Sequence, residues 1–431
     1  MNKRVAFFTL GCKLNFSETS TIARQFAELG FNRVQPTDEA DIYIINTCSV
    51  TEHADKKCRQ AIRKFATQSP QALIAVVGCY AQLKPDEVAS IEGVDLVMGA
   101  SGKDSIPLYL SKLEKKSNVK VFSCDIDSVS DFFPAYSSAD RTRSFLKVQD
   151  GCDYHCTYCT IPLARGKSRN IPIEKVLEQA RLIVQSGVKE IILTGVNTGD
   201  FGRTTGEKFV DLLKALEQVE GLHRIRVSSV EPNLVTDEVI SLFANSSTLL
   251  PHFHIPLQSG SNRILALMKR RYNRELFANR VTEVKKAIPN VFIGVDVIVG
   301  FPGETNDDFM DSYNLLKKLE VSFLHVFPYS PRPNTPAAEI TEKVSQKIVN
   351  ERVKLLMQLS ETLHANFYKK NLGNTDGVLF ESSRKNNLMF GFTRNYIKVE
   401  FPYSKQMVNS IVGVKLNEIA PSGNFSVILI D

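Results

Sequence analysis

The chain has 431 residues, of which 43% are hydrophobic and 23% charged, and its formal net charge is +6. This length accommodates two or three globular domains, and no apolar run reaches the ~18 residues of a membrane span. The N-terminus enters a strand-like run without a small-residue cleavage site, so we expect no secretory signal. Eight cysteines in a chain of this size do not suit a disulfide scaffold, and clustered cysteines more often indicate a metal protein. The modest positive charge permits a nucleic-acid partner without requiring one.

Residues 1–122 alternate short apolar runs with amphipathic stretches, which predicts an α/β domain with a parallel sheet. The expected strands are Val5–Leu10, Ile42–Ile45 and Leu73–Val77, and the expected helices are Ser17–Leu29 and 51–66.

A cysteine follows each of the three expected strands: Cys12, Cys48 and Cys79. The carboxyl ends of parallel strands share one edge of a sheet, where open α/β sheets bind ligands, so we expect these thiols to converge. Gly11 and Gly78 permit tight turns beside a bulky cofactor. The pattern therefore predicts a cluster held by three cysteines, and three buried structural cysteines are the alternative.

Residues 123–143 are polar and irregular, without a hydrophobic period, and we interpret them as a linker. Cys124 falls in this linker and Cys58 in a helix-like run, so we expect neither to be a ligand.

From residue 144 to 371, strand and helix signals alternate again, which predicts a full or partial TIM-like barrel closed by a long helix. The expected strands are Phe145–Val148, Glu190–Thr194, Arg224–Ser228, His252–Ile255, Phe292–Val299 and Phe323–Phe327. The expected helices include Ile173–Ser186, Lys208–Gln218, Asn262–Met268, Arg274–Ala287, Thr305–Leu319 and Val344–Lys370.

Three more cysteines, Cys152, Cys156 and Cys159, lie in one loop directly after the first barrel strand. Three thiolates on one tight loop can hold three irons of a [4Fe–4S] cluster and leave the fourth iron open, whereas ferredoxin-type runs add a fourth cysteine. A zinc site or three core cysteines are the alternatives, but zinc sites usually pair cysteines as CxxC or with histidine. We expect His155 to pack rather than ligate. The spacing resembles the cluster loop of radical S-adenosylmethionine (SAM) enzymes, whose open iron binds SAM.

Residues 372–431 hold five short strand signals, which predicts a small antiparallel β-barrel.

Over essentially its whole length the chain resembles the methylthiotransferases, radical SAM enzymes with two iron–sulfur clusters. The resemblance rests on the segments 11–15, 46–51, 78–82, 149–152, 161–169, 254–261 and 300–305. The C-terminal barrel resembles the TRAM domain, which engages tRNA in that family. Segments 11–15 and 46–51 look most like the branch that acts on N6-threonylcarbamoyladenosine in tRNA.

The resemblance implies that a cluster on Cys152, Cys156 and Cys159 reduces SAM to a 5′-deoxyadenosyl radical, which attacks carbon 2 of the modified adenine next to the anticodon. It implies that a second [4Fe–4S] cluster on Cys12, Cys48 and Cys79 carries the sulfur, so that two SAM molecules are consumed. An electron donor protein and a sulfur source are the further partners expected of a cytoplasmic, membrane-free and monomeric enzyme.

Positions that match the family's SAM contacts are Tyr158, Gly195, Asn197, Ser228, Glu231 and Val297. The segment 194–197 departs from the usual glycine-glycine-glutamate pattern, which puts its side-chain contacts in doubt. For all six positions, ordinary strand-end structure is the alternative.

Two basic groups, Arg165–Arg169 and Lys269–Arg271, are candidates for tRNA phosphates, and Phe392 or Tyr396 for the RNA surface of the small barrel. A solvated charged face is the alternative for both basic groups.

Other functions stay open on the sequence alone. The chain could methylthiolate another tRNA adenosine or a protein side chain with the same two clusters. It could also be a nonenzymatic iron–sulfur RNA-binding protein, although purely structural clusters are normally fully ligated by protein.

Overall fold

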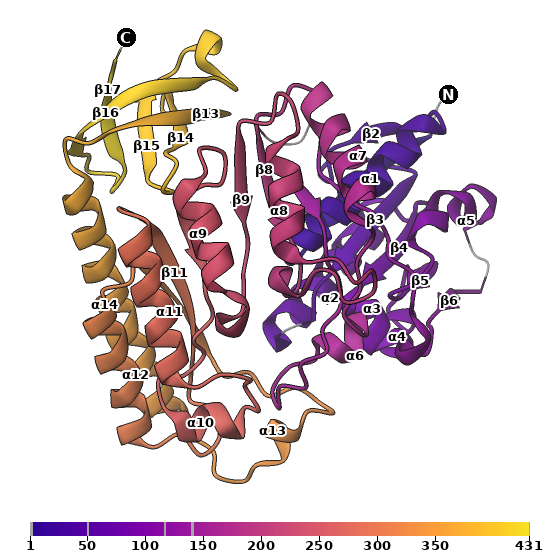
Figure 1. Ribbon diagram of the computed structural model, residues 1–431. Helices are drawn as coiled ribbons and strands as arrows, with labels where there is room; N and C mark the ends of the chain where they lie inside the picture. The colour runs from indigo at the N-terminus through magenta and orange to yellow at the C-terminus, as the bar shows by residue number, and fades with distance from the viewer. Residues whose placement is uncertain (1–2, 50, 116–117, 139–141, 431) are drawn as a thin grey trace.

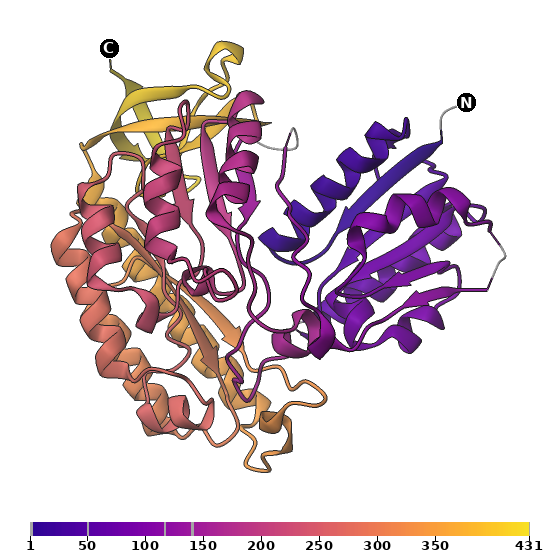
Figure 2. The same cartoon turned by 45° about the vertical axis from the view of Figure 1, so that its right-hand side comes forward.

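The computed structural model describes residues 3–49, 51–115, 118–138 and 142–430 (Figure 1). Val50 of one quoted segment and residues 139–141 of the predicted linker lie outside the described residues. Three regions follow one another along the chain: an α/β domain, a strand–helix domain that curves around a central cavity, and a small β-barrel (Figures 1 and 2). Among the described residues, no helix is both long enough and apolar enough to cross a membrane.

The N-terminal region contains the expected parallel sheet, with six strands in the order β2-β1-β3-β4-β5-β6. The strands are β1 (Arg4–Thr9), β2 (Asn32–Val34), β3 (Ile42–Thr47), β4 (Leu73–Gly78), β5 (Leu96–Met98) and β6 (Lys120–Phe122). The helices are α1 (Lys13–Glu28), α2 (Glu52–Gln68), α3 (Cys79–Leu83), α4 (Pro85–Ala89) and α5 (Ile106–Lys112), with short 3-10 turns at Lys103–Ser105 and Ile126–Ser128.

The central strands of this sheet are apolar on both faces because helices cover both. Alternate residues of β3 enter different cores: Tyr43 and Ile45 pack with Phe65 of α2, whereas Ile42 and Ile44 pack with Phe26 of α1. β2, β5 and β6, each of three residues, were not among the expected strands.

The second region is a partial barrel of six parallel strands rather than a closed one. Two three-stranded sheets, β7-β8-β9 and β10-β11-β12, are joined by isolated parallel bridges between Ile225 and Leu249 and between Ser229 and His254. The strands are β7 (Ser144–Lys147), β8 (Glu190–Thr194), β9 (Arg224–Val227), β10 (His252–His254), β11 (Phe292–Val299) and β12 (Phe323–Pro328). The helices are α6 (Ile161–Arg165), α7 (Ile173–Gln185), α8 (Phe209–Glu217), α9 (Asp237–Asn245), α10 (Asn262–Leu267), α11 (Arg274–Ala287), α12 (Asn306–Leu319), α13 (Pro336–Glu339) and α14 (Gln346–Asn371).

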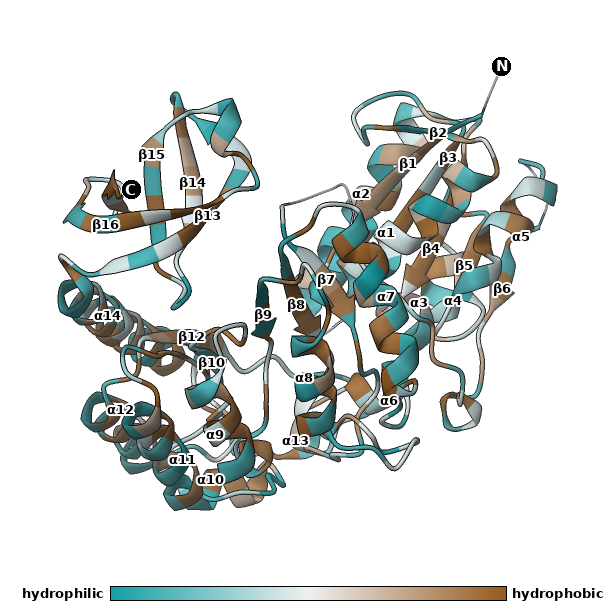
Figure 3. Ribbon diagram, turned by 45° about the horizontal axis from the view of Figure 1, so that its top comes forward, coloured by the Kyte–Doolittle hydropathy of each residue, from teal (hydrophilic) through white to brown (hydrophobic). Residues whose placement is uncertain are grey.

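The helices of this region are amphipathic and pack their apolar sides against the strands. In Figure 3 brown and teal residues alternate along α11 and α12, as expected for helices with one buried side. Val281 and Val284 of α11 and Leu316 of α12 join Val295 and Val297 of β11 in one core.

The C-terminal region is a closed five-stranded barrel in the order β13-β14-β15-β17-β16. Its strands are β13 (Thr375–Lys385), β14 (Leu388–Phe392), β15 (Lys398–Pro402), β16 (Ile411–Ile419) and β17 (Phe425–Leu429). All its pairings are antiparallel except that of β15 with β17. This barrel packs against the N-terminal ends of the central strands: Arg224 at the start of β9 donates to the carbonyls of Gly377 (2.6 Å) and Phe392 (3.1 Å).

Candidate active site

The loop with Cys152, Cys156 and Cys159 directly follows β7, as expected, and several donors point at its sulfurs. The amides of Tyr154 and Ile161 donate to Cys152 Sγ (3.4 Å) and Cys159 Sγ (3.5 Å), and Arg270 Nη1 lies 3.0 Å from Cys156 Sγ. Hydrogen bonds of this kind stabilise thiolates and tune iron–sulfur clusters.

Burial of this loop disfavours charge on its own. It raises the pKa of Cys152 and of Cys159 to about 12, with the neighbouring thiols adding to the effect. These sulfurs therefore ionise only when bound positive charge compensates them, as metal ions do.

Cys12, Cys48 and Cys79 follow β1, β3 and β4, which are neighbours in the sheet. Their register aligns the strand ends, with Thr9 opposite Asn46 and Thr47 opposite Gly78. The three cysteines therefore start from one edge, as predicted from the sequence.

Two glycines in left-handed backbone conformations let these turns approach one another. Gly11 has φ +122°, and a Cβ there would lie 2.8 Å from Cys48 Cβ. Gly78 has φ +99°, and a Cβ there would lie 2.6 Å from the Thr47 carbonyl oxygen. Side chains at either position would push Cys48 or Cys79 away from the shared edge.

Asn15 of α1 ties this cysteine set to the other region. Cys12 Sγ donates to Asn15 Oδ1 (3.1 Å), and Asn15 Nδ2 donates to the carbonyl of Thr47 (2.9 Å). Arg165, six residues beyond Cys159, also donates to Asn15 Oδ1 (3.3 Å). One amide thus links Cys12 to Arg165, which ends the helix that follows the Cys152 loop.

The spread of the thiols distinguishes a cluster from a single ion. Within the described ranges, neither cysteine set brings three Sγ atoms within 4.8 Å of one another, which one tetrahedral zinc would require. A cubane of four irons and four sulfides holds its thiolates farther apart. The thiols are therefore not gathered around a single zinc ion, and that both sets hold [4Fe–4S] clusters stays a prediction.

The remaining cysteines lie outside both sets, as expected. Cys58 is fully buried behind the Cys48 loop, where its thiol donates to the Cys48 carbonyl (3.6 Å). Cys124 contacts Gln82 instead.

A buried charge network lies between the two cysteine sets. Glu18 of α1 is fully buried and pairs with Lys103 (2.7 Å), Lys147 (3.0 Å) and Arg165 (3.1 Å). Asp150 pairs with Lys147 (2.6 Å) and Arg165 (2.9 Å). Burial alone would raise the pKa of Glu18, but these cations outweigh it and hold that pKa well below its usual range. The network joins the N-terminal sheet to the partial barrel.

A second clamp holds the Cys48 side. Arg332, in the proline-rich loop after β12, is nearly fully buried and donates to Ser49 Oγ and Asp55 Oδ2, both at 2.8 Å. Ser49 also donates to Asp55 (2.6 Å), so the segment next to Cys48 is held by residues almost 280 positions away.

Four of the six predicted SAM positions, Gly195, Asn197, Ser228 and Glu231, follow the ends of β8 and β9. Asn197 is 3% exposed, and neither its Nδ2 nor its Oδ1 has a hydrogen-bond partner among the described residues. A buried amide without partners is costly, so its two polar atoms await a ligand. Gly195 leaves no room for a side chain, since a Cβ would lie 2.9 Å from Gln149 Oε1.

The other predicted SAM positions are occupied by protein contacts. Ser228 and Thr198 share a hydrogen bond (2.9 Å), and Glu231 pairs with Arg270. Tyr158 packs edge-on against Phe301. Val297 lies in the core beside α11 and α12, and its adenine contact stays a prediction.

A cavity of about 1110 Å³ opens inside the partial barrel, and all three regions line it. The N-terminal region contributes Cys12 and Lys13, and the C-terminal barrel contributes Phe392, Tyr396 and Lys398. The barrel strands line the rest of it, from Thr194 and Ser228 to His252 and His325.

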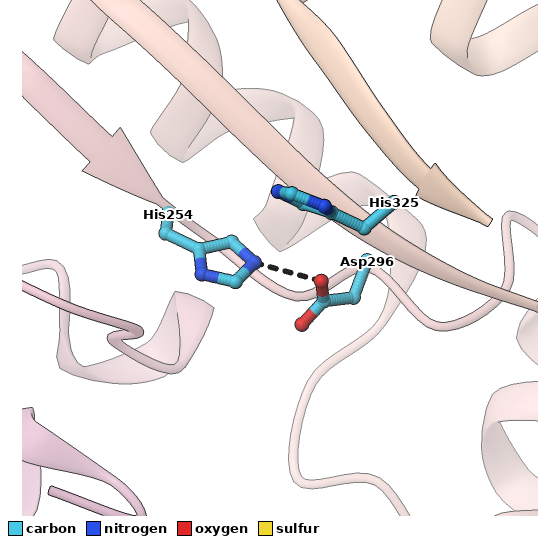
Figure 4. Close-up of side chains that lie close together, drawn as sticks. All are labelled: His254, Asp296 and His325. Atoms are coloured by element: carbon cyan, nitrogen blue, oxygen red, sulfur yellow. Dashed lines mark hydrogen bonds and ion pairs between the residues drawn. The ribbon is translucent and has the colours of Figure 1, made fainter. Parts of the chain in front are cut away.

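Three side chains that sequence reasoning missed meet at this cavity: His254 and His325 line it, and Asp296 lies next to them (Figure 4). His254 Nε2 lies 2.7 Å from Asp296 Oδ1, and the ligand atoms of His254, Asp296 and His325 all lie within 4.8 Å of one another. Burial lowers the pKa of His325, so its imidazole stays neutral and able to accept a hydrogen bond. The sequence feature that could have indicated this group is a charged residue, Asp296, within the apolar run Phe292–Val299.

The structure corrects the interpretation of the basic groups. Arg165 and Arg169 are 3% and 4% exposed and serve the charge network, not tRNA phosphates. Arg270 is likewise buried, in contact with Glu231 and Cys156.

The aromatic residues of the C-terminal barrel form part of a connected series of rings. Phe392 stacks on Tyr396 at 4.9 Å, and Tyr396 contacts His252 of β10 at 4.7 Å. Tyr396 has φ 68°, a strained conformation for a tyrosine that directs its ring toward the cavity.

Two family models match the chain. Residues 4–99 match the Uncharacterized protein family UPF0004, and residues 146–316 match the Radical SAM superfamily.

Curated relatives match over nearly the full length. The chain is 42% identical to the threonylcarbamoyladenosine tRNA methylthiotransferase of Bacillus subtilis, covering 96% of this chain and 93% of that protein. It is 39% identical to the Aquifex aeolicus protein of the same name, over 92% and 96%. It is 32% identical to the tRNA-2-methylthio-N(6)-dimethylallyladenosine synthase of Acetivibrio thermocellus, over 95% and 88%.

Solved structures support the fold. The radical S-adenosylmethionine methyltransferase TsrM from Kitasatospora setae, solved with cobalamin and a [4Fe–4S] cluster, superposes with a TM-score of 0.58. It shares 13% identity, and the match covers 78% of this chain and 77% of that one.

Proposed function

The chain belongs to the radical SAM methylthiotransferase family, and from this membership we propose that it inserts a methylthio group at carbon 2 of N6-threonylcarbamoyladenosine in tRNA. The coarser assignment is secure: the protein is a tRNA methylthiotransferase whose cofactors are iron–sulfur and SAM. The nucleoside, the use of two clusters and the use of two SAM molecules are the proposed part.

The observation that carries the proposal is the presence of two incomplete cysteine sets joined by one buried network. Each set offers three thiols, and Asn15 and Arg165 connect them. A protein that needed iron–sulfur only for stability would gain nothing from leaving both sets open.

The residues assign one task to each set. Cys152, Cys156 and Cys159 would hold the cluster that binds SAM, and Cys12, Cys48 and Cys79 would hold the cluster that supplies sulfur. When bound, the first cluster supplies the electron for radical formation from SAM, and the second supplies sulfur for transfer. Reducing electrons and a sulfur source come from outside the chain.

The protein's own side chains orient these groups. Asn197 offers two unpaired amide atoms at the strand end where SAM is expected. Arg270 keeps a positive charge 3.0 Å from Cys156 Sγ and is held in place by Glu231. The cavity is large enough to admit a modified adenine beside Cys12.

The relatives favour threonylcarbamoyladenosine over another adenosine. Four relatives named for that nucleoside are 36–42% identical, whereas those named for dimethylallyladenosine are 32–34% identical. An unmodified protein side chain and a nonenzymatic role have no comparable support.

Mass spectrometry of tRNA nucleosides tests the proposal. Cells that lack the protein should lose the 2-methylthio derivative of threonylcarbamoyladenosine and accumulate the unmethylthiolated nucleoside. Expression of the wild-type chain should restore it, and the Cys152→Ala variant should not. Loss of 2-methylthio-dimethylallyladenosine instead would move the protein to the other branch.

A further inference from the structure

One wall of the cavity is basic, and some of its hydrogen-bond donors are unpaired. Lys13, the residue after Cys12, lines it, and its ammonium makes no hydrogen bond or ion pair with any described residue. Arg143 lines the same cavity and pairs with Glu381 through Nη2 (2.8 Å), whereas its buried Nη1 lies 3.9 Å from Glu190 and has no hydrogen-bond partner among the described residues.

The carboxylates around this wall are already committed. Glu190 is shared by Arg226 (3.1 Å), Arg224 (3.7 Å) and Arg143 (3.9 Å). Asp296 is hydrogen-bonded to His254. Asp296 attracts Lys13 electrostatically but forms no ion pair with it among the described residues, so the Lys13 ammonium can accept an anion from a ligand.

The position of Lys13 next to Cys12 suggests which part of the substrate it would contact. Carbon 2 and carbon 6 of adenine both adjoin N1, so the reacting carbon and the N6 substituent share one edge of the ring. Cys12 belongs to the set proposed to supply sulfur to carbon 2, and Lys13 is its neighbour in the chain. A charged group on the N6 substituent would then come within reach of Lys13.

We propose that Lys13 binds the carboxylate of the threonylcarbamoyl group, with Arg143 Nη1 as a second donor, and that this contact selects an anionic N6 substituent over an uncharged one. The inference rests on the proposed function and names the specificity determinant of that site. An ammonium and a guanidinium both form strong hydrogen bonds to a carboxylate, whereas an uncharged alkenyl substituent would leave them unpaired.

Lys398 provides a matched control because it lines the same cavity from the opposite domain. It lies over the ring of Phe390 at 4.7 Å and has no ion pair among the described residues. It belongs to the C-terminal barrel, whereas Cys12 and Lys13 belong to the N-terminal region, so it serves as the candidate for a tRNA phosphate.

The test asks whether the preference for a charged substrate depends on the Lys13 side chain. It compares variants and two tRNA substrates with reconstituted holoenzyme. The substrates are tRNA that carries threonylcarbamoyladenosine and the same tRNA after its carboxylate has been coupled to methylamine. Wild type should favour the acid over the amide by about 10- to 100-fold in both Kd and KM, the value of a hydrogen bond to a charged group. Lys13→Gln should lose this preference by weakening binding of the acid alone, and Lys13→Arg should retain most of it. Lys398→Gln should weaken both tRNAs alike.

The outcomes separate this contact from the proposed function. Product from both tRNAs with no preference in wild type overturns the contact and leaves the function intact. Selective binding of the acid tRNA without any methylthio product refutes the function and not the contact. If Lys13→Gln loses iron, the same comparison of acid and amide tRNAs is made with Arg143→Gln and Lys13→Arg instead. Equal binding of acid and amide by wild type would then decide against the contact.

Discussion

Cys152, Cys156 and Cys159 come from eight consecutive residues after one strand, whereas Cys12, Cys48 and Cys79 come from three strand ends far apart in the sequence. The first set is positioned by one loop and its local amide donors. The second depends on sheet register, on two glycines with positive φ and on contacts from another region. A local set tolerates changes elsewhere in the fold, but a distributed set is only as well ordered as the domain that carries it.

The largest effect should come from removing the local set. Replacing Cys152, Cys156 and Cys159 by Ala should abolish SAM cleavage and product formation, because no other thiols stand at the barrel loop. Anaerobically reconstituted wild type should hold about eight irons and this variant about four, if both clusters are cubane-type. Cys124→Ser, which removes a cysteine outside both sets, should keep all the iron. A triple variant without any iron would contradict two independent sites.

Removing the distributed set should separate two activities. With Cys12, Cys48 and Cys79 replaced by Ala, the reduced enzyme should still release 5′-deoxyadenosine, because the residues predicted to bind SAM all lie outside the N-terminal domain. It should form no methylthiolated nucleoside, since its sulfur-carrying site is gone. Methylthio product from this variant, measured by mass spectrometry, would show that the set has another role.

The buried network should be the most sensitive link between the two sets. Glu18→Gln leaves Lys103 without its ion-pair partner and leaves Lys147 and Arg165 with Asp150 as their remaining carboxylate. Breaking one partner of a buried ion network costs about 3–5 kcal/mol, so denaturant unfolding should shift by this amount. Glu178→Gln, which removes an exposed pair with Lys175, should cost about 0–1 kcal/mol. Equal losses of unfolding free energy in the two variants would show that the buried network does not stabilise the link between the two cysteine sets.

The same network gives an expected pH dependence. The folded-state pKa of Glu18 is held below its unfolded value, so the stability it contributes is complete above about pH 4 to 5 and is lost as the pH falls through the folded pKa. Wild type should therefore lose stability on acidification more steeply than Glu18→Gln does. Parallel acid curves for the two proteins would count against this assignment.

Much of the fold could be predicted from the sequence because periodic, apolar segments dominate it. Glu190–Thr194, Phe292–Val299 and Arg274–Ala287 have the predicted bounds, because each is a distinct apolar or amphipathic run with clear ends. β2 and β5 have three residues each, too few for a period to emerge, and depend on neighbours in the sheet. Closure of the barrel could not be predicted either, because it depends on pairing between strands and not on the strands themselves.

The candidate site divides in the same way. Cys152, Cys156 and Cys159 were recognisable from spacing alone, whereas the convergence of Cys12, Cys48 and Cys79 required a predicted strand order. The burial of Arg165 and the meeting of His254 with Asp296 are tertiary facts, and no local pattern distinguishes a buried arginine from a phosphate-binding one. Sequence reasoning therefore offered Arg165–Arg169 as a candidate for tRNA phosphates, which was wrong for Arg165 and Arg169.

The smallest expected effect concerns the C-terminal barrel. The sequence suggested that the segment after Gly373 adds tRNA affinity rather than chemistry, and the structure places its Tyr396 ring at the cavity, stacked on Phe392. If a tRNA base stacks on this ring, Tyr396→Ala should weaken tRNA binding by about 1–3 kcal/mol, and Tyr396→Phe should restore most of it. Stacking depends little on ionic strength, so the slope of log Kd against log salt should stay near the wild-type value, whereas Lys398→Gln should reduce it because one phosphate contact is lost. SAM cleavage without tRNA should be unchanged in both variants, since neither residue contacts the Cys152 loop. A flattened salt slope in Tyr396→Ala would indicate that the ring only supports the barrel's basic surface, and tRNA would then be held mainly by its phosphates.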